Sequence, residues 1–178
     1  AFNEPRQSDR VAPARPSATG AMSALARQLI AQGRSVISLS EGELDFDTPV
    51  HIQHAAIKGI VEGQTRYTNV GGTPALKAAV QRKFAQDNGL DYQPNELIAA
   101  TGAKQILFNA LLATLNAGDE ALVVAPFWVS YSEMVRIAGG EPVVVTPTPE
   151  QDFKLTPELL RAHLTPRTRW LILNAPCN

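Results

Sequence analysis

The second half of the chain alternates short apolar runs with helical segments, and this pattern limits the fold more than any other feature of the sequence. The apolar runs are LIAAT (97–101), ALVVAP (121–126), PVVV (142–145) and WLILN (170–174). Segments with helical periodicity separate them at about 104–115, 128–138 and 157–164. Apolar strands joined by helical crossovers form a mostly parallel sheet with both faces covered. The sequence therefore predicts an α/β fold with three layers, α/β/α.

The first part of the chain is organised differently. Residues 1–19 are rich in Pro, Ser and Arg and show no periodicity, which predicts an arm or leader segment. Apolar residues at helical spacing predict a helix over 21–31 that Gly33 ends, and a short strand, VISLS, follows at 36–40.

Two more helices are expected before the alternating half. Asp47 or Thr48 can cap the first, which has Pro49 in its first turn. The second starts near Pro74 and ends where Gly89 supplies a left-handed cap.

Bulk composition excludes several classes of partner. The 178 residues carry 16 basic and 17 acidic side chains, a net charge of -1, which disfavours binding to nucleic acid or to an anionic membrane. No apolar run approaches the roughly 18 residues of a membrane-spanning helix. A single cysteine, Cys177, excludes an internal disulfide and fits a reducing cytoplasm. We therefore expect a cytoplasmic protein whose ligand is a small molecule.

Small residues, a lysine and large aromatic side chains follow the predicted strands at their carboxyl ends. Gly102, Ala103 and Lys104 come after the first strand, and Trp128 comes after the second. A lysine in the first turn of a helix opposes the helix dipole unless an anion binds there, and backbone N–H groups at a helix start can hold a phosphate. Trp128 offers a flat face for stacking, and the NAPCN turn (174–178) supplies an asparagine for a ring substituent. A phosphorylated aromatic ligand would use all three features, although an ordinary turn and core packing explain each one taken alone.

Metal-binding patterns are weaker. His51 and His54 share a helix face with Lys58, which is more typical of a solvated face than of a metal site. Asp45 and Asp47 could hold a divalent metal, but turn formation and helix capping explain these carboxylates more simply. We expect no metal.

Five stretches carry a more specific signal: SEGELDFDTPVHI, GQTRYTNVGGTPALKAAV, NGLDY, TGAKQILFNALLATLNAGDEALVVAPFWVSY and TPRTRWLILNAPCN. They resemble the amino-terminal part of class I pyridoxal-phosphate (PLP) aminotransferases of fold type I, particularly the bacterial aspartate aminotransferases. The resemblance implies an arm over 1–19, the amino-terminal segment of a small domain with the substrate loop over 20–47, and the first part of the large PLP-binding domain over 48–178.

The resemblance also implies roles for single residues around the cofactor. Gly102, Ala103 and Lys104 match the turn that cradles the cofactor phosphate, and Trp128 matches the aromatic residue stacked on the pyridine ring. Asn178 matches the asparagine that hydrogen-bonds the phenolic oxygen of the ring and lies beside the substrate carboxylate.

Two further positions concern the substrate and a partner subunit. Gly42 matches the glycine whose backbone approaches the substrate carboxylate, so that Gly42, Trp128 and Asn178 form the implied substrate contacts. Tyr67 matches the tyrosine that reaches the cofactor phosphate of the neighbouring subunit, which implies a homodimer. The alternative for Tyr67 is a loop aromatic packed on its own subunit.

The implied activity is transamination through PLP between an acidic amino acid such as aspartate and a 2-oxo acid such as 2-oxoglutarate. The Schiff-base lysine of the family follows the asparagine-rich turn, whereas all five lysines of this chain precede it: Lys58, Lys77, Lys83, Lys104 and Lys154. We therefore expect a fragment without a catalytic residue, active only within a complete chain. In the family's sheet, later strands lie between 170–174 and 97–101, so 97–101 would lack a neighbour here. An inactive remnant, a non-catalytic regulator with this fold, and a PLP-dependent lyase or synthase remain open alternatives.

Overall fold

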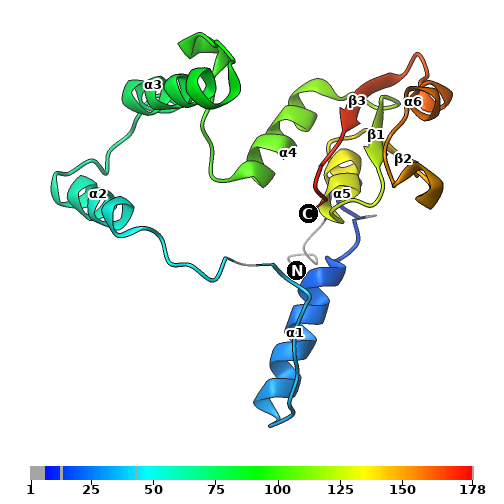
Figure 1. Cartoon of the computed structure of the whole chain (residues 1–178), viewed down its shortest axis with the longest axis horizontal. Coiled ribbons are helices and arrows are strands. Elements are labelled where there is room, and N and C mark those ends of the chain that lie inside the picture. Colours follow the sequence, from blue (N-terminus) through cyan, green and yellow to red (C-terminus); the bar gives the residue numbers. More distant parts are fainter. Residues whose placement is uncertain (1–6, 13, 43, 178) are drawn as a thin grey trace, which may run out of the picture. The chain divides into compact units, whose positions relative to one another are not determined.

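The computed structural model describes residues 7–12, 14–42 and 44–177 (Figure 1). The chain divides into two compact units. One, the middle unit, is Gly42–Ile106, and the other, the sheet unit, joins Ala1–Glu41 to Leu107–Asn178. The helices and strands are, in chain order, α1 (Ala18–Ala31), α2 (Val50–Val61), α3 (Pro74–Lys83), α4 (Ala103–Thr114), β1 (Glu120–Val124), α5 (Ser130–Ile137), β2 (Glu141–Val145), α6 (Pro157–His163) and β3 (Thr168–Ile172).

The sheet unit is built on three parallel strands in the order β2-β1-β3. Val124 pairs with Val145 on one side of β1, and Val123 pairs with Ile172 on the other. Every residue of the central strand β1 is buried. The predicted parallel α/β sheet is confirmed. The strands expected at 121–126, 142–145 and 170–174 are present, and each of their boundaries lies within two residues of the predicted one.

Successive residues of β1 point to opposite faces of the sheet, and each face is covered by helices. The first core cluster, on one face, consists of Leu111, Leu115, Ala121, Val123, Tyr131, Met134, Val135 and Ala138. The second core cluster, on the other face, consists of Leu122, Val124 and Val145, with Leu159 and Leu160 of α6 packed against it. Because α4 and α5 supply the first cluster and α6 covers the second, the sheet unit has the three layers that the sequence predicts (Figure 1).

Two segments predicted as strands do not pair: 36–40, where the prediction is wrong, and 97–101, for which the resemblance already implied a missing neighbour. Neither residues 97–100 nor residues 36–39 join a ladder, although Leu97 has extended backbone angles, with φ -115° and ψ 137°. A strand needs a neighbour to pair its backbone groups, and in the middle unit the N–H of Ala99 instead donates to the carbonyl of Gly71 at 3.0 Å. In the sheet unit, Ser40 exchanges side-chain hydrogen bonds of 2.8 Å with Ser23 and Ser38. Apolar character alone is therefore not enough to place these residues in a sheet.

The helix boundaries are mostly as predicted, with one correction at α2. α3 starts at Pro74 behind the cap Thr73, and Gly89 has a φ of 65° beyond the π-helical turn Phe84–Asn88. The expected capping of α2 by Asp47 or Thr48 is wrong, because Pro49 occupies the N-cap and no side chain caps the helix. The carbonyl of Thr48 instead accepts a hydrogen bond from the amide of Gln53 at 2.5 Å.

Candidate cofactor-binding site

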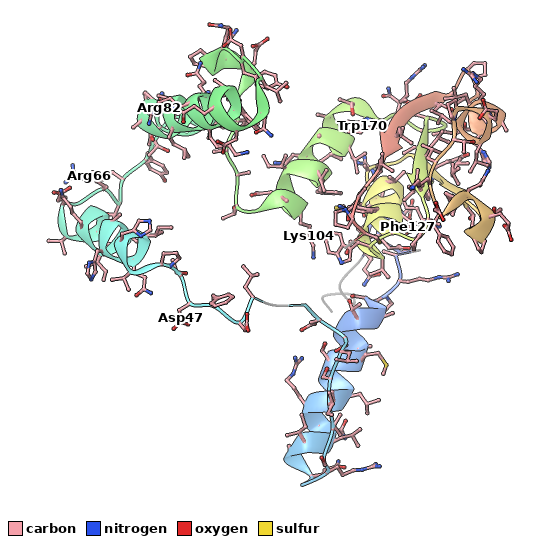
Figure 2. All side chains as sticks on the ribbon, viewed as in Figure 1. Asp47, Arg66, Arg82, Lys104, Phe127 and Trp170 are labelled. Carbon is pink, nitrogen blue, oxygen red and sulfur yellow. The ribbon has the colours of Figure 1, made fainter. Side chains whose placement is uncertain are left out.

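The start of α4 is shaped by one glycine. Gly102 directly precedes α4 and has a φ of +88°, in the left-handed region that favours glycine. A Cβ placed on Gly102 would meet nothing within 4 Å, so the backbone conformation rather than crowding accounts for the glycine. Ala103 and Lys104 form the first helical residues, both are exposed, and Lys104 extends from the first turn of α4 (Figure 2).

Gln105 ties this turn to the residue before Gly102. Its side-chain oxygen accepts hydrogen bonds from the backbone N–H of Thr101 at 2.7 Å and from the Thr101 hydroxyl at 2.6 Å. The N–H of Gly102 donates to the carbonyl of Ala100 at 2.9 Å. Sequence reasoning missed Gln105, although a glutamine at the third helical position is a known signal for side-chain capping. The turn is therefore held in shape by its own side chains.

The chemistry of this turn fits an anion. N–H groups in the first turn of a helix lack intrahelical acceptors, and the helix dipole places partial positive charge there. Lys104 adds a cation at the same place, and the small side chains of Gly102 and Ala103 allow a ligand to approach the backbone. A phosphate ester has the charge and the acceptor oxygens for this donor set.

The aromatic platform expected from the sequence lies in the sheet unit. Trp128 follows β1, is half-buried, and packs on the first core cluster together with Phe127. The ring of Trp128 lies edge-to-face with that of Tyr131, at 5.5 Å between centroids and 84° between planes. Core packing therefore describes part of what Trp128 does, but the residue is only partly buried and retains some accessible surface.

A hollow of about 400 Å³ lies at the carboxyl ends of β1 and β3. Pro126, after β1, and the turn Asn174–Cys177, after β3, line it together with the loop Asp152–Lys154. The thiol of Cys177 donates to the carbonyl of Pro126 at 3.1 Å, so the two strand ends are in contact. Sequence reasoning placed the NAPCN turn at this rim but missed the loop. Asp152 and Phe153 have positive φ angles of 51° and 55°. A bulky residue such as phenylalanine rarely adopts a positive φ, so the sequence did not indicate this loop conformation.

The other expected site residues are exposed or lie outside the described part. Gly42 is exposed, and Tyr67 exposes its whole side chain, with a relative accessibility of 108%, in the loop that also holds Arg66 (Figure 2). Among the described residues of the middle unit, Tyr67 therefore has no packing partner. Asn178 lies outside the described residues. Gly42, Tyr67 and the turn Gly102–Lys104 belong to the middle unit, and Trp128 belongs to the sheet unit.

The described residues show neither a metal-binding cluster nor a membrane-spanning helix. Within 7–12, 14–42 and 44–177, no three His, Cys, Asp or Glu side chains gather as metal ligands. His51 and His54 are exposed on α2. Among the helices of that part of the chain, none is long and apolar enough to cross a membrane.

Comparisons with known proteins agree with this architecture. An aspartate/prephenate aminotransferase of Cereibacter sphaeroides is 54% identical over 171 residues, which cover 96% of this chain and 43% of the relative. The solved aspartate aminotransferase of Rhizobium meliloti superposes with a TM-score of 0.93 at 44% identity, covering 98% of this chain and 44% of that one. The aspartate aminotransferase of Thermus thermophilus with maleate gives a TM-score of 0.93 at 45% identity, with 98% and 46% covered. The chain thus spans less than half the length of these relatives. The family model for aminotransferases of class I and II matches residues 34–178, and the chain belongs to that family.

Proposed function

We propose that this chain forms the PLP-binding part of an aminotransferase. The complete protein moves an amino group between aspartate, or another acidic amino acid, and a 2-oxo acid such as 2-oxoglutarate. The observation that carries this proposal is the family match over residues 34–178, supported by relatives that are themselves named aspartate aminotransferases. The single cysteine supports a place in the cytoplasm.

Three groups of residues would hold the cofactor. In the complete protein, the turn Gly102, Ala103 and Lys104 would bind its phosphate through backbone N–H groups and one cation, Trp128 would stack on its ring, and Asn178 would hydrogen-bond its phenolic oxygen. The left-handed Gly102 at the start of α4 and the partly buried Trp128 support the first two roles. When bound, PLP supplies an electron sink for the charge left when a proton leaves the α-carbon of the amino acid. The residues of this chain would bind the cofactor and orient it.

Substrate and partner contacts complete the proposal. The backbone of Gly42 approaches the substrate carboxylate, beside Trp128 and Asn178. Tyr67 reaches the phosphate site of a partner subunit in a homodimer, and its fully exposed side chain supports a contact outside its own chain. Residues 20–47 belong to a small domain and 48–178 to the large domain of the complete protein. The arm expected over 1–19 lies partly outside the described residues, and its last two residues, Ala18 and Thr19, begin α1. The two compact units reflect contacts within this chain alone.

The chain by itself is not expected to transaminate. Each of its five lysines precedes the turn that starts at Asn174, and the Schiff-base lysine of the family follows that turn. The purified chain with PLP, aspartate and 2-oxoglutarate should form the 2-oxo acid of aspartate no faster than PLP does without protein. Faster formation would contradict this part of the proposal.

A chimera tests the proposed function directly. This chain replaces the 171 aligned residues of the Cereibacter sphaeroides relative, which supplies the remainder. We expect the chimera to bind PLP and to transfer the amino group of aspartate to 2-oxoglutarate. A folded chimera that binds no PLP would refute the proposal, and one that eliminates instead of transaminating would identify a lyase.

A further inference from the structure

Trp128 and Tyr131 are linked by backbone as well as by their rings. The N–H of Tyr131 donates to the carbonyl of Trp128 at 3.1 Å, so one turn at the start of α5 sets the spacing of the two residues. Their rings meet at 84°, a favourable edge-to-face arrangement. The indole of Trp128 and the ring of Tyr131 are therefore direct neighbours within one turn of the chain.

Tyr131 is held by the core. Its side chain is 8% exposed and belongs to the first core cluster, with Leu111 of α4, Val123 of β1 and Val135 of α5. Leu111 and Val135 are 1% and 0% exposed. A ring enclosed by close-packed neighbours has few alternative positions. Trp128 lies at the border of the same cluster and is only partly buried, and the enclosed ring of Tyr131 gives its indole a rigid neighbour.

We propose that Tyr131 is a positioning residue that fixes the plane of the Trp128 indole. A perpendicular ring can cover at most one of the two faces of an indole, so Tyr131 can hold Trp128 and still allow a planar ligand to stack on it. Tyr131 does not touch that ligand. An indole whose plane is already fixed loses less rotamer freedom when a ligand binds. The part of this inference that concerns a ligand rests on the proposed function, in which Trp128 stacks on the cofactor ring.

The test isolates the indole of Trp128. The sequence contains two tryptophans, so a Trp170→Phe background leaves Trp128 as the only one. In that background, Tyr131→Leu removes the ring, and Tyr131→Phe keeps it without the hydroxyl. Val135→Ala is the matched control, because Val135 is fully buried in the same cluster and on the same helix but carries no ring. Urea unfolding shows whether Tyr131→Leu and Val135→Ala lose comparable stability.

Two readouts separate positioning from general loosening. The first is the long-wavelength indole band of the near-ultraviolet circular dichroism spectrum, where tyrosine does not absorb. The second is quenching of Trp128 fluorescence by pyridoxine 5′-phosphate, which lacks the aldehyde and so cannot react with lysines. Tyr131→Leu should lose most of the indole band and bind the probe about three- to tenfold more weakly. Tyr131→Phe and Val135→Ala should retain both.

The indole band of the circular dichroism spectrum tests the positioning role of Tyr131 without any ligand. An indole band that is absent from the parent, unchanged in Tyr131→Leu, or lost equally in Val135→Ala would overturn the inference. A parent that shows the band but does not bind pyridoxine 5′-phosphate would refute the proposed role of Trp128 and leave the positioning by Tyr131 intact.

Discussion

The carboxylate of Glu120 accepts a hydrogen bond of 2.5 Å from the hydroxyl of Thr165, 45 residues later in the chain. Arg167 pairs with the same carboxylate, and Glu120 is only 3% exposed. These contacts tie the amino end of β3 to the amino end of β1, where the ladder shifts register between Glu120 and Ala121. A buried carboxylate thus fixes the start of the strand that leads to the asparagine-rich turn.

Acid should weaken this connection. The hydrogen bond from Thr165 lowers the pKa of Glu120 from its ordinary value of 4.5, against the opposing effect of burial, and Arg167 and Thr168 lower it further. Because the folded chain binds this proton more weakly than the unfolded chain, the stabilisation is present above pH 4.5 and is lost as the pH falls through the lowered pKa. With Glu120→Gln, the free energy of unfolding should therefore fall less steeply as the pH drops below 4.5.

Urea unfolding at a series of pH values measures this slope. Glu141→Gln is the matched control, because Glu141 pairs in register with Glu120 on β2 but is exposed. Its slope should follow that of the parent. Equal slopes in the parent and in Glu120→Gln would show that Glu120 is not the group that titrates.

Gly102→Ala should destabilise the chain by about 1–2 kcal/mol, because an L side chain in the left-handed region crowds its own backbone. Gly42→Ala is the control, since Gly42 has equal space around it and a φ outside the left-handed range. Urea midpoints compare the two variants. A loss of stability that is as large for Gly42→Ala would mean that backbone conformation does not explain Gly102.

Leu111→Ala should lower the free energy of unfolding by about 2–5 kcal/mol, because it leaves a cavity in the first core cluster. Leu112 is its neighbour on α4, but it is 47% exposed whereas Leu111 is 1% exposed. Leu112→Ala should cost clearly less in the same urea measurement. Similar losses at both positions would contradict the assignment of this helix face to the core.

Lys104→Gln should weaken binding of pyridoxine 5′-phosphate by about two- to fivefold at low salt, because an exposed charge contributes at most about 1 kcal/mol. The difference should shrink in high salt, which screens exposed charges. Lys58→Gln is the control, since Lys58 pairs with Glu62 at 3.7 Å on exposed α2. Fluorescence titration gives the affinities, and an equal loss at Lys58 would indicate a nonspecific charge effect.

The fold was predictable where the signal is local. The runs at 121–126, 142–145 and 170–174 are strands, because β-branched apolar residues with helical crossovers between them favour a buried parallel sheet. Ile98 lies in an equally apolar run, yet it is 64% exposed and outside the sheet. The apolar character of residues 97–101 does not show whether they pair, and only the resemblance to the family's sheet implied that their neighbour is missing here.

In the candidate site, too, local features were predictable from the sequence and long-range contacts were not. Gly102 and Lys104 were identifiable because their residue types are unusual at a helix start, and Trp128 because of its place after a strand. The perpendicular contact of Trp128 with Tyr131 was not predictable, because residues three apart on a helix turn can meet in several rotamers. The hollow beside Cys177 was not predictable either, because its walls come from three loops distant in sequence.

The sequence by itself determined the family, the approximate positions of the helices and of three strands, and a set of residues that we propose bind a phosphorylated aromatic ligand. These depend on residue identity and on periodicity over a few neighbours. Only the tertiary structure decided the order β2-β1-β3, the burial of Glu120 beneath Thr165 and Arg167, and the anchoring of Trp128 against Tyr131. These depend on long-range packing, in which each side chain is placed by atoms that the local sequence does not specify.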